Sequence, residues 1–73
     1  MLNLDEKISK NIKNIMRNKF GTGTKCAEVL GVSPRSLNDS INKIKQNKYP
    51  SIKQLKRIAS VCDCEITDFF KVD

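Results

Sequence analysis

Apolar residues recur along this chain at intervals of three and four, which is the spacing of one helix face rather than the alternation of a strand. The first stripe has polar residues opposite it, and its members are Leu4, Ile8, Ile12, Ile15 and Met16. It predicts an amphipathic helix over about residues 4–18, and the apolar residue Phe20 follows this helix. The same spacing continues in the later segments, so the chain is predicted to be all-α.

Residues that start and end helices divide the rest of the chain. Thr22 is a predicted N-cap for a short helix over 23–30, and Gly31 ends it, where a left-handed residue is expected. The apolar side of this helix comprises Cys26, Ala27, Val29 and Leu30. Ser33-Pro34 starts a third helix, because serine caps free N–H groups and proline needs no donor at the first helical position. This helix is predicted to reach about Lys45.

Two more helices are predicted after a polar loop over 46–50. Ser51 caps the fourth, whose apolar stripe comprises Ile52, Leu55, Ile58, Ala59 and Cys62. A final short helix begins at Glu65 or Thr67, and its apolar residues are Ile66, Phe69 and Phe70. One phenylalanine is expected to seal the core and the other to be exposed. The prediction is a single domain over 1–73, folded as a compact five-helix bundle.

Length and composition argue against catalysis. The chain has 73 residues and no histidine, so it lacks the commonest general base and the commonest metal ligand. Core packing is the favoured interpretation of Cys26, Cys62 and Cys64, with redox sensing or metal binding as the alternative. No catalytic residue, metal site or cofactor is predicted. The acidic N-terminal segment and the lack of a long apolar run favour the cytoplasm over a membrane.

Positive charge is concentrated in the middle of the chain. The formal net charge is +6; residues 33–58 hold seven basic residues and one acidic residue, whereas residues 59–73 hold one basic and four acidic. A polyanion such as nucleic acid is the partner that this distribution favours. The alternative is an ordinary solvated, lysine-rich surface.

The segment from 26 to 37 joins two predicted helices through only three residues, Gly31-Val32-Ser33. Ala27 is small where the two helices would cross, and Gly31 tolerates the positive φ that the turn needs. Val32 and Leu37 are apolar and are expected in the wedge between the helices. The pattern predicts a helix-turn-helix over about residues 23–45, a unit that places its second helix in the major groove of DNA.

These residues resemble the lambda-repressor-like (Cro/repressor, xenobiotic-response-element type) helix-turn-helix family. The similarity lies in Ala27–Ser33, Pro50–Leu55 and Ile58–Phe70, which follow in order at near-family spacing. The stretch between Gly31 and Pro50 is longer than is usual in the family, so extra residues are expected in the third helix or its following loop. The resemblance implies a small bacterial or phage-encoded transcriptional regulator, favoured as a repressor of phage, mobile-element or toxin–antitoxin type, associated with the nucleoid.

A third helix lying in the major groove would face base edges with its exposed residues. The predicted base-reading residues are Arg35, Ser36, Asn38, Asp39 and Asn42. Arg35 suits guanine and Asn38 suits adenine, while Asp39 can only accept and suits the cytosine amino group. The predicted phosphate-binding residues flank that helix and are Thr22, Thr24, Lys25, Ser33, Lys43, Lys45 and Lys48. The alternative is that these are solvated side chains, with Ser33 a simple cap.

We therefore expect sequence-specific binding to double-stranded DNA, with no membrane partner. The resemblance implies a homodimer joined through the C-terminal helix with Phe69 and Phe70. Such a dimer would read an inverted repeat whose half-sites lie about one DNA turn apart. The alternative function is a helical protein-interaction module that keeps the fold without binding DNA.

Overall fold

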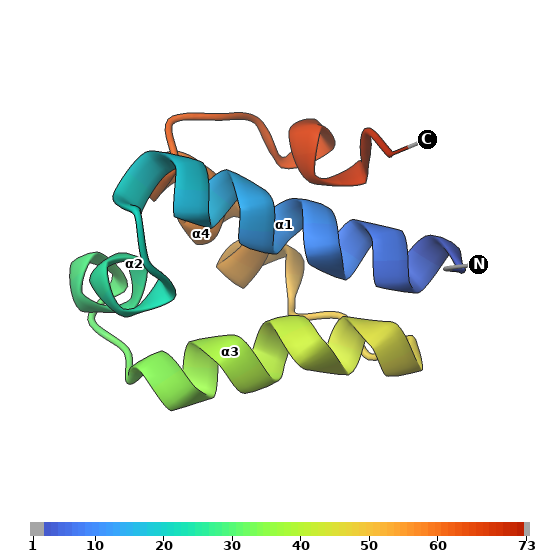
Figure 1. Ribbon diagram of the computed structural model, residues 1–73, viewed down its shortest axis with the longest axis horizontal. Helices are drawn as coiled ribbons and strands as arrows, with labels where there is room; N and C mark the ends of the chain where they lie inside the picture. Colours follow the sequence, from blue (N-terminus) through green and yellow to red (C-terminus); the bar gives the residue numbers. More distant parts are fainter. Residues whose placement is uncertain (1–2, 73) are drawn as a thin grey trace.

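A computed structural model describes residues 3–72, and every regular element in that stretch is helical. The α-helices are α1 (Leu4–Phe20), α2 (Gly23–Leu30), α3 (Pro34–Asn42) and α4 (Ile52–Val61). Two 3-10 helices complete the fold, η1 (Lys43–Gln46) and η2 (Ile66–Phe70) (Figure 1). The all-α prediction is confirmed. Among the described residues no helix is long and apolar enough to cross a membrane.

The predicted count of five α-helices is wrong. The expected fifth helix is the 3-10 helix η2, which has only five residues. The third α-helix ends at Asn42 rather than near Lys45, and the chain tightens there into η1. Residues Lys43–Gln46 therefore continue the third helix as a 3-10 turn. A short 3-10 piece at the end of an α-helix is a common way to satisfy its last carbonyls.

Side-chain caps define where the helices begin. The hydroxyls of Thr22, Ser33 and Ser51 accept hydrogen bonds from the backbone N–H three residues later, at 3.2, 3.1 and 3.2 Å. All three caps were predicted from the sequence, and each satisfies one of the free donors at a helix start. The first helix is longer than predicted, because Phe20 belongs to it and Gly21, at φ 81°, ends it.

The core is built around α1, which runs through the middle of the molecule (Figure 1). The chain from α3 to η1 lies along one side of α1, and the C-terminal segment lies along the other. Ile12, Ile41 and Phe69 are completely buried, one from each of these three parts. The fourteen buried apolar residues form one cluster, which agrees with the helical stripes of the sequence.

Three residues that were expected on inward stripes are exposed instead. Leu4 and Ile52 are the first residues of α1 and α4, and their side chains are 62% and 61% exposed, because both helices start beyond the edge of the core. Val29 is 57% exposed, since the eight-residue α2 meets the core with Cys26, Ala27 and Leu30 only. The spacing of apolar residues predicts which positions share a helix face, but it does not predict which of them are buried.

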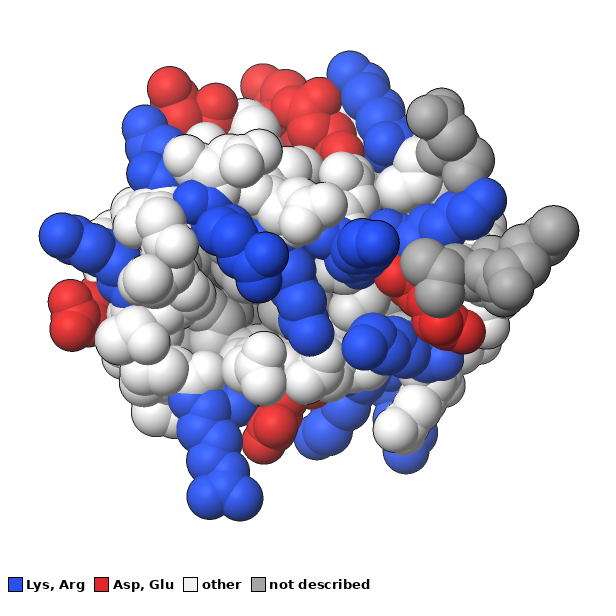
Figure 2. Space-filling view, viewed as in Figure 1, with Lys and Arg blue, Asp and Glu red and all other residues white. Residues whose placement is uncertain are grey.

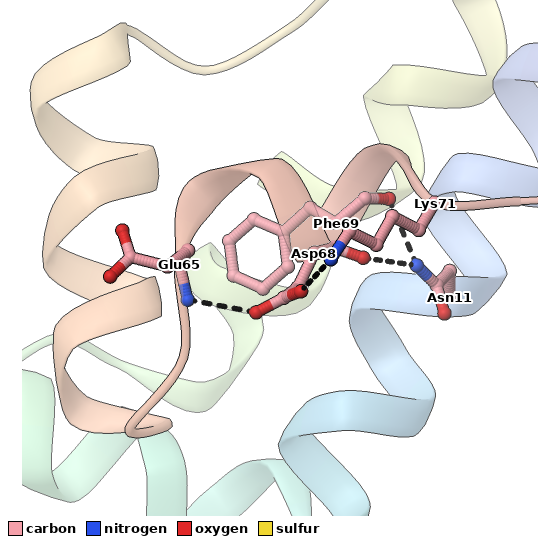
Figure 3. Close-up of polar contacts among 5 residues, drawn as sticks. All are labelled: Asn11, Glu65, Asp68, Phe69 and Lys71. Carbon is pink, nitrogen blue, oxygen red and sulfur yellow. Dashed lines mark hydrogen bonds and ion pairs between the residues drawn. The ribbon is translucent and has the colours of Figure 1, made fainter.

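The side chain of Asn11 in α1 forms hydrogen bonds with the C-terminal segment (Figure 3). The Asn11 amide nitrogen donates to the backbone carbonyls of Asp68 and Phe69, at 2.9 and 3.0 Å. The Asp68 carboxylate accepts from the Glu65 backbone N–H at 3.0 Å and pairs with Lys71 at 3.0 Å. These contacts lower the pKa of Asp68, the backbone hydrogen bond most of all. They hold η2 so that Phe69 fills the core and Phe70 points outward, 42% exposed, as predicted for the pair.

A buried serine joins α1 to α3. The Ser9 hydroxyl donates to the backbone carbonyl of Ile41 at 2.9 Å, and both residues are fully buried. We expect Ser9→Ala to lower the free energy of unfolding by about 1 kcal/mol, the net worth of a typical hydrogen bond. Urea unfolding measures this change, and Ser60→Ala, on the exposed side of α4, is the control. Equal stability of the two variants would mean that the hydrogen bond contributes nothing.

Candidate nucleic-acid interface

The candidate interface is carried by α2, α3 and the three residues between them. Gly31 has φ 77°, in the left-handed region that favours glycine, and its N–H donates to the Glu28 carbonyl at 3.2 Å. The Val32 N–H donates to the Ala27 carbonyl at 3.0 Å. The helices α2 and α3 pack against each other; Ala27 and Leu37 are buried in the core, and Val32 is half-buried against it. The side chains expected between the helices thus belong to the core or pack against it.

A second contact, from α4, holds the end of α2 in place. One guanidinium nitrogen of Arg57 donates to the Leu30 carbonyl at 3.0 Å, so a cation caps the carbonyl end of α2. The two residues are 27 positions apart and belong to no motif. Sequence reasoning missed Arg57 because nothing local connects it to the turn.

The first turns of α3 present a row of polar side chains to solvent. Arg35, Ser36, Asn38 and Asp39 are all exposed, while Leu37 and Ile41 are buried on the other side of the helix. Within residues 3–72, no ion pair engages Arg35 or Asp39, so both charged groups keep their hydrogen-bonding capacity for a partner. Ser36 is tied to the cap, because its hydroxyl accepts from the Ser33 hydroxyl at 2.9 Å.

Asn42 does not share this exposed surface. It is half-buried at the last residue of α3, and its side-chain oxygen accepts a hydrogen bond from the Lys13 ammonium group of α1. The side chain therefore joins two helices of the protein itself. The structure brings together four of the five predicted base-reading residues and sets Asn42 apart.

The predicted phosphate-binding residues fall into two groups, one at the starts of α2 and α3 and the other beyond the end of α3. Thr22, Thr24, Lys25 and Ser33 are exposed near the starts of α2 and α3, while Lys43, Lys45 and Lys48 are exposed in η1 and the turn after it. The Thr22 and Ser33 hydroxyls already cap their helices. Free backbone donors at a helix start and nearby ammonium groups are both suited to phosphate oxygens.

Charge is unevenly distributed over the surface. Figure 2 shows Lys and Arg side chains gathered where α1 lies beside the end of α3 and η1. Acidic side chains gather along the upper edge of the same view, beside the C-terminal segment. A shallow surface depression there is lined by Ser60, Asp63, Cys64, Glu65 and Asp68. Positive charge thus predominates where α1, the end of α3 and η1 meet, and negative charge predominates beside the C-terminal segment.

The cysteines belong to the core and its edge. Cys26 and Cys62 are buried thiols in contact, and Cys64 is half-buried. Burial raises the pKa of Cys26 and Cys64, and burial together with the neighbouring thiols raises the pKa of Cys62 to about 12. Groups of three or more metal-ligating side chains do not occur within residues 3–72. The positions of the thiols agree with the packing interpretation.

The order in which the three cysteines are alkylated should follow how deeply they are buried. We expect iodoacetamide at neutral pH to label Cys64 first, and to label Cys26 and Cys62 only when the protein unfolds, because a thiolate is the reacting species and their thiolates are both buried and scarce. Mass spectrometry with and without urea measures the order. Fast native labelling of Cys62 would contradict the packed arrangement.

No protein-family model, curated protein or solved structure matches this chain.

Proposed function

We propose that this protein is a sequence-specific DNA-binding regulator that reads the major groove with the first turns of α3. One observation carries the proposal: Arg35, Asn38 and Asp39 are exposed on a helix that packs on α2. Within residues 3–72, neither Arg35 nor Asp39 forms an ion pair. A helix-turn-helix also joins its two helices through three or four residues and places the second helix in the groove, so the short connection between α2 and α3 supports the proposal.

Each of these side chains matches a feature of a base edge. The Arg35 guanidinium can donate two hydrogen bonds to guanine O6 and N7, and the Asn38 amide can pair with adenine N6 and N7. The Asp39 carboxylate can accept from the cytosine amino group. The buried Leu37 and Ile41 keep the helix on the core while this polar side faces outward. Together these hydrogen bonds would distinguish one base pair from another directly.

Phosphate contacts would come from the start of α2 and from the residues beyond the end of α3. Thr24 and Lys25 lie at the start of α2, where backbone N–H groups favour an anion, and Lys43 and Lys48 lie beyond the end of α3. These contacts orient the helix in the groove and add affinity that does not depend on sequence. The acidic C-terminal side would then face away from the DNA.

The proposal includes a two-fold dimer. Phe69, which was expected at the dimer interface, is completely buried and cannot take part in it. Phe70 is 42% exposed and its ring centroid lies 6.3 Å from that of Tyr49, so these two rings form an apolar surface that a second copy could cover. A dimer would read an inverted repeat. Sedimentation equilibrium with and without operator DNA measures the oligomeric state of the protein. A monomer in the DNA complex would contradict this part of the proposal.

Binding to a mixed-sequence duplex tests the phosphate contacts. We expect affinity to fall steeply with salt, because each neutralised phosphate releases bound counterions. Lys43→Ala/Lys48→Ala should weaken binding and reduce the slope of log K against log salt by about 0.9 for each phosphate that the variant no longer neutralises. Fluorescence anisotropy across a salt series measures both quantities. The matched control is Lys56→Ala/Lys71→Ala, which removes the same charge beside the acidic side; equal effects of both variants would contradict a localised interface.

A further inference from the structure

Three lysines from distant parts of the sequence surround one pocket. The pocket has a volume of about 270 Å³ and is lined by Lys10 and Lys13 of α1, Lys45 of η1 and Glu6 of the first turn of α1. The helices α1 and η1 pack directly against each other, which brings Lys45 beside residues more than thirty positions earlier. Figure 2 shows basic side chains gathered in this part of the surface.

The charges around the pocket are not balanced. Three lysines and one glutamate line it, which gives the lining a formal surplus of two positive charges. Within residues 3–72, no carboxylate lies within 4.0 Å of the Lys10, Lys13 or Lys45 nitrogen. Over the same residues the Lys13 ammonium has a single hydrogen-bond acceptor, the Asn42 side chain, and so keeps donors for a ligand.

The surroundings of Lys13 disfavour the charged form of its ammonium group. Its pKa is lowered, first by partial burial and then by the positive charges of Lys45 and Arg17. An anion that binds beside these like-charged, partly desolvated groups stabilises their charged form. A bound anion should therefore raise the pKa of Lys13 again.

We propose that this pocket binds a phosphate group, with Lys10, Lys13 and Lys45 as its cationic ligands. The charge of a phosphate monoester above its second pKa, near 6, equals the surplus of the lining. The pocket is much too small for a helix or a duplex, but it admits a phosphate with a small substituent. The phosphate can belong to a free phosphorylated molecule, whose monoester carries two charges, or to the DNA backbone, whose diester carries one; both present non-bridging oxygens that accept from ammonium groups.

The site is distinct from the base-reading surface. It includes none of the exposed residues in the first turns of α3, and it joins α1 to η1 rather than α2 to α3. Through Lys13 it contacts Asn42, the last residue of α3. An anion held there would bridge α1 and the far end of α3, so the protein should become more stable in its presence.

A titration with inorganic pyrophosphate, followed by NMR at constant ionic strength, tests the site. We expect saturable shifts of the Lys10, Lys13 and Lys45 signals and a rise in the pKa of the Lys13 ammonium. Lys13→Gln/Lys45→Gln should weaken the affinity at least tenfold. The matched control is Lys53→Gln/Lys56→Gln on exposed positions of α4, which should bind as the unchanged protein does.

Two results would overturn the site. One is a lack of saturation, and the other is an equal loss of affinity in both double variants, which would indicate general screening of surface lysines. A second arm adds duplex DNA to the pyrophosphate complex. Displacement of pyrophosphate identifies the DNA backbone as the source of the phosphate, and simultaneous binding identifies a free phosphorylated molecule. The pyrophosphate arm contains no DNA, so its outcome is independent of the proposed function.

Discussion

Replacing Phe69 with alanine is expected to lower the free energy of unfolding by about 3–5 kcal/mol, the range found for large aromatic residues removed from a core. Phe69 is completely buried, and η2 holds it against α1 through the Asn11 amide. The total stability of a small domain is about 5–15 kcal/mol, so the loss would be a large part of it. Urea unfolding followed by circular dichroism measures the change.

The neighbouring residue provides the control. Phe70 has the same side chain on the same 3-10 helix, but it is 42% exposed, so Phe70→Ala should cost much less. A Phe69→Ala variant as stable as Phe70→Ala would show that the C-terminal segment contributes little to the core. That result would contradict the packing described above.

The Arg35→Ala/Asn38→Ala variant should lose most of its discrimination between operator and mixed-sequence DNA. Each good bidentate contact with a base is worth about 1–3 kcal/mol of discrimination, and both contacts would be removed. Binding to mixed-sequence DNA should fall much less, because phosphate contacts supply that affinity. Fluorescence anisotropy with an operator duplex and a scrambled duplex, at one salt concentration, measures the ratio.

A variant of the same composition on another helix is the control. Asn14→Ala/Arg17→Ala removes the same two residue types from the exposed side of α1 and changes the net charge equally. It should leave the ratio of operator to scrambled affinity unchanged. If both double variants lowered this ratio alike, base reading by α3 would be refuted.

Local signals in the sequence predicted the helix starts and the turn. Ser33-Pro34 and Ser51 mark helix starts because capping involves residues only three positions apart. Gly31 was expected in a left-handed conformation for an equally local reason, and φ 77° agrees. The apolar periodicity likewise predicted most of the core, with Leu4, Val29 and Ile52 as the exceptions at helix starts and on the short α2.

Contacts between distant residues could not be predicted in this way. The hydrogen bonds from Ser9 to Ile41, from Asn11 to the C-terminal segment and from Arg57 to Leu30 each join residues at least 27 positions apart. Asn42 was grouped with the base-reading residues because it follows them on the same helix, yet Lys13 of another helix determines its environment. The end of α3 was misplaced because the change from α-helix to 3-10 helix has no strong local signal.

Selection of bound fragments from a pool of random duplex DNA is the most direct test of the proposed function. We predict that the protein enriches one inverted-repeat motif, and that Arg35→Ala/Asn38→Ala blurs the motif at the base pairs that α3 reads. Recovery of no motif at low salt would contradict sequence-specific DNA binding and favour a helical protein-interaction module instead.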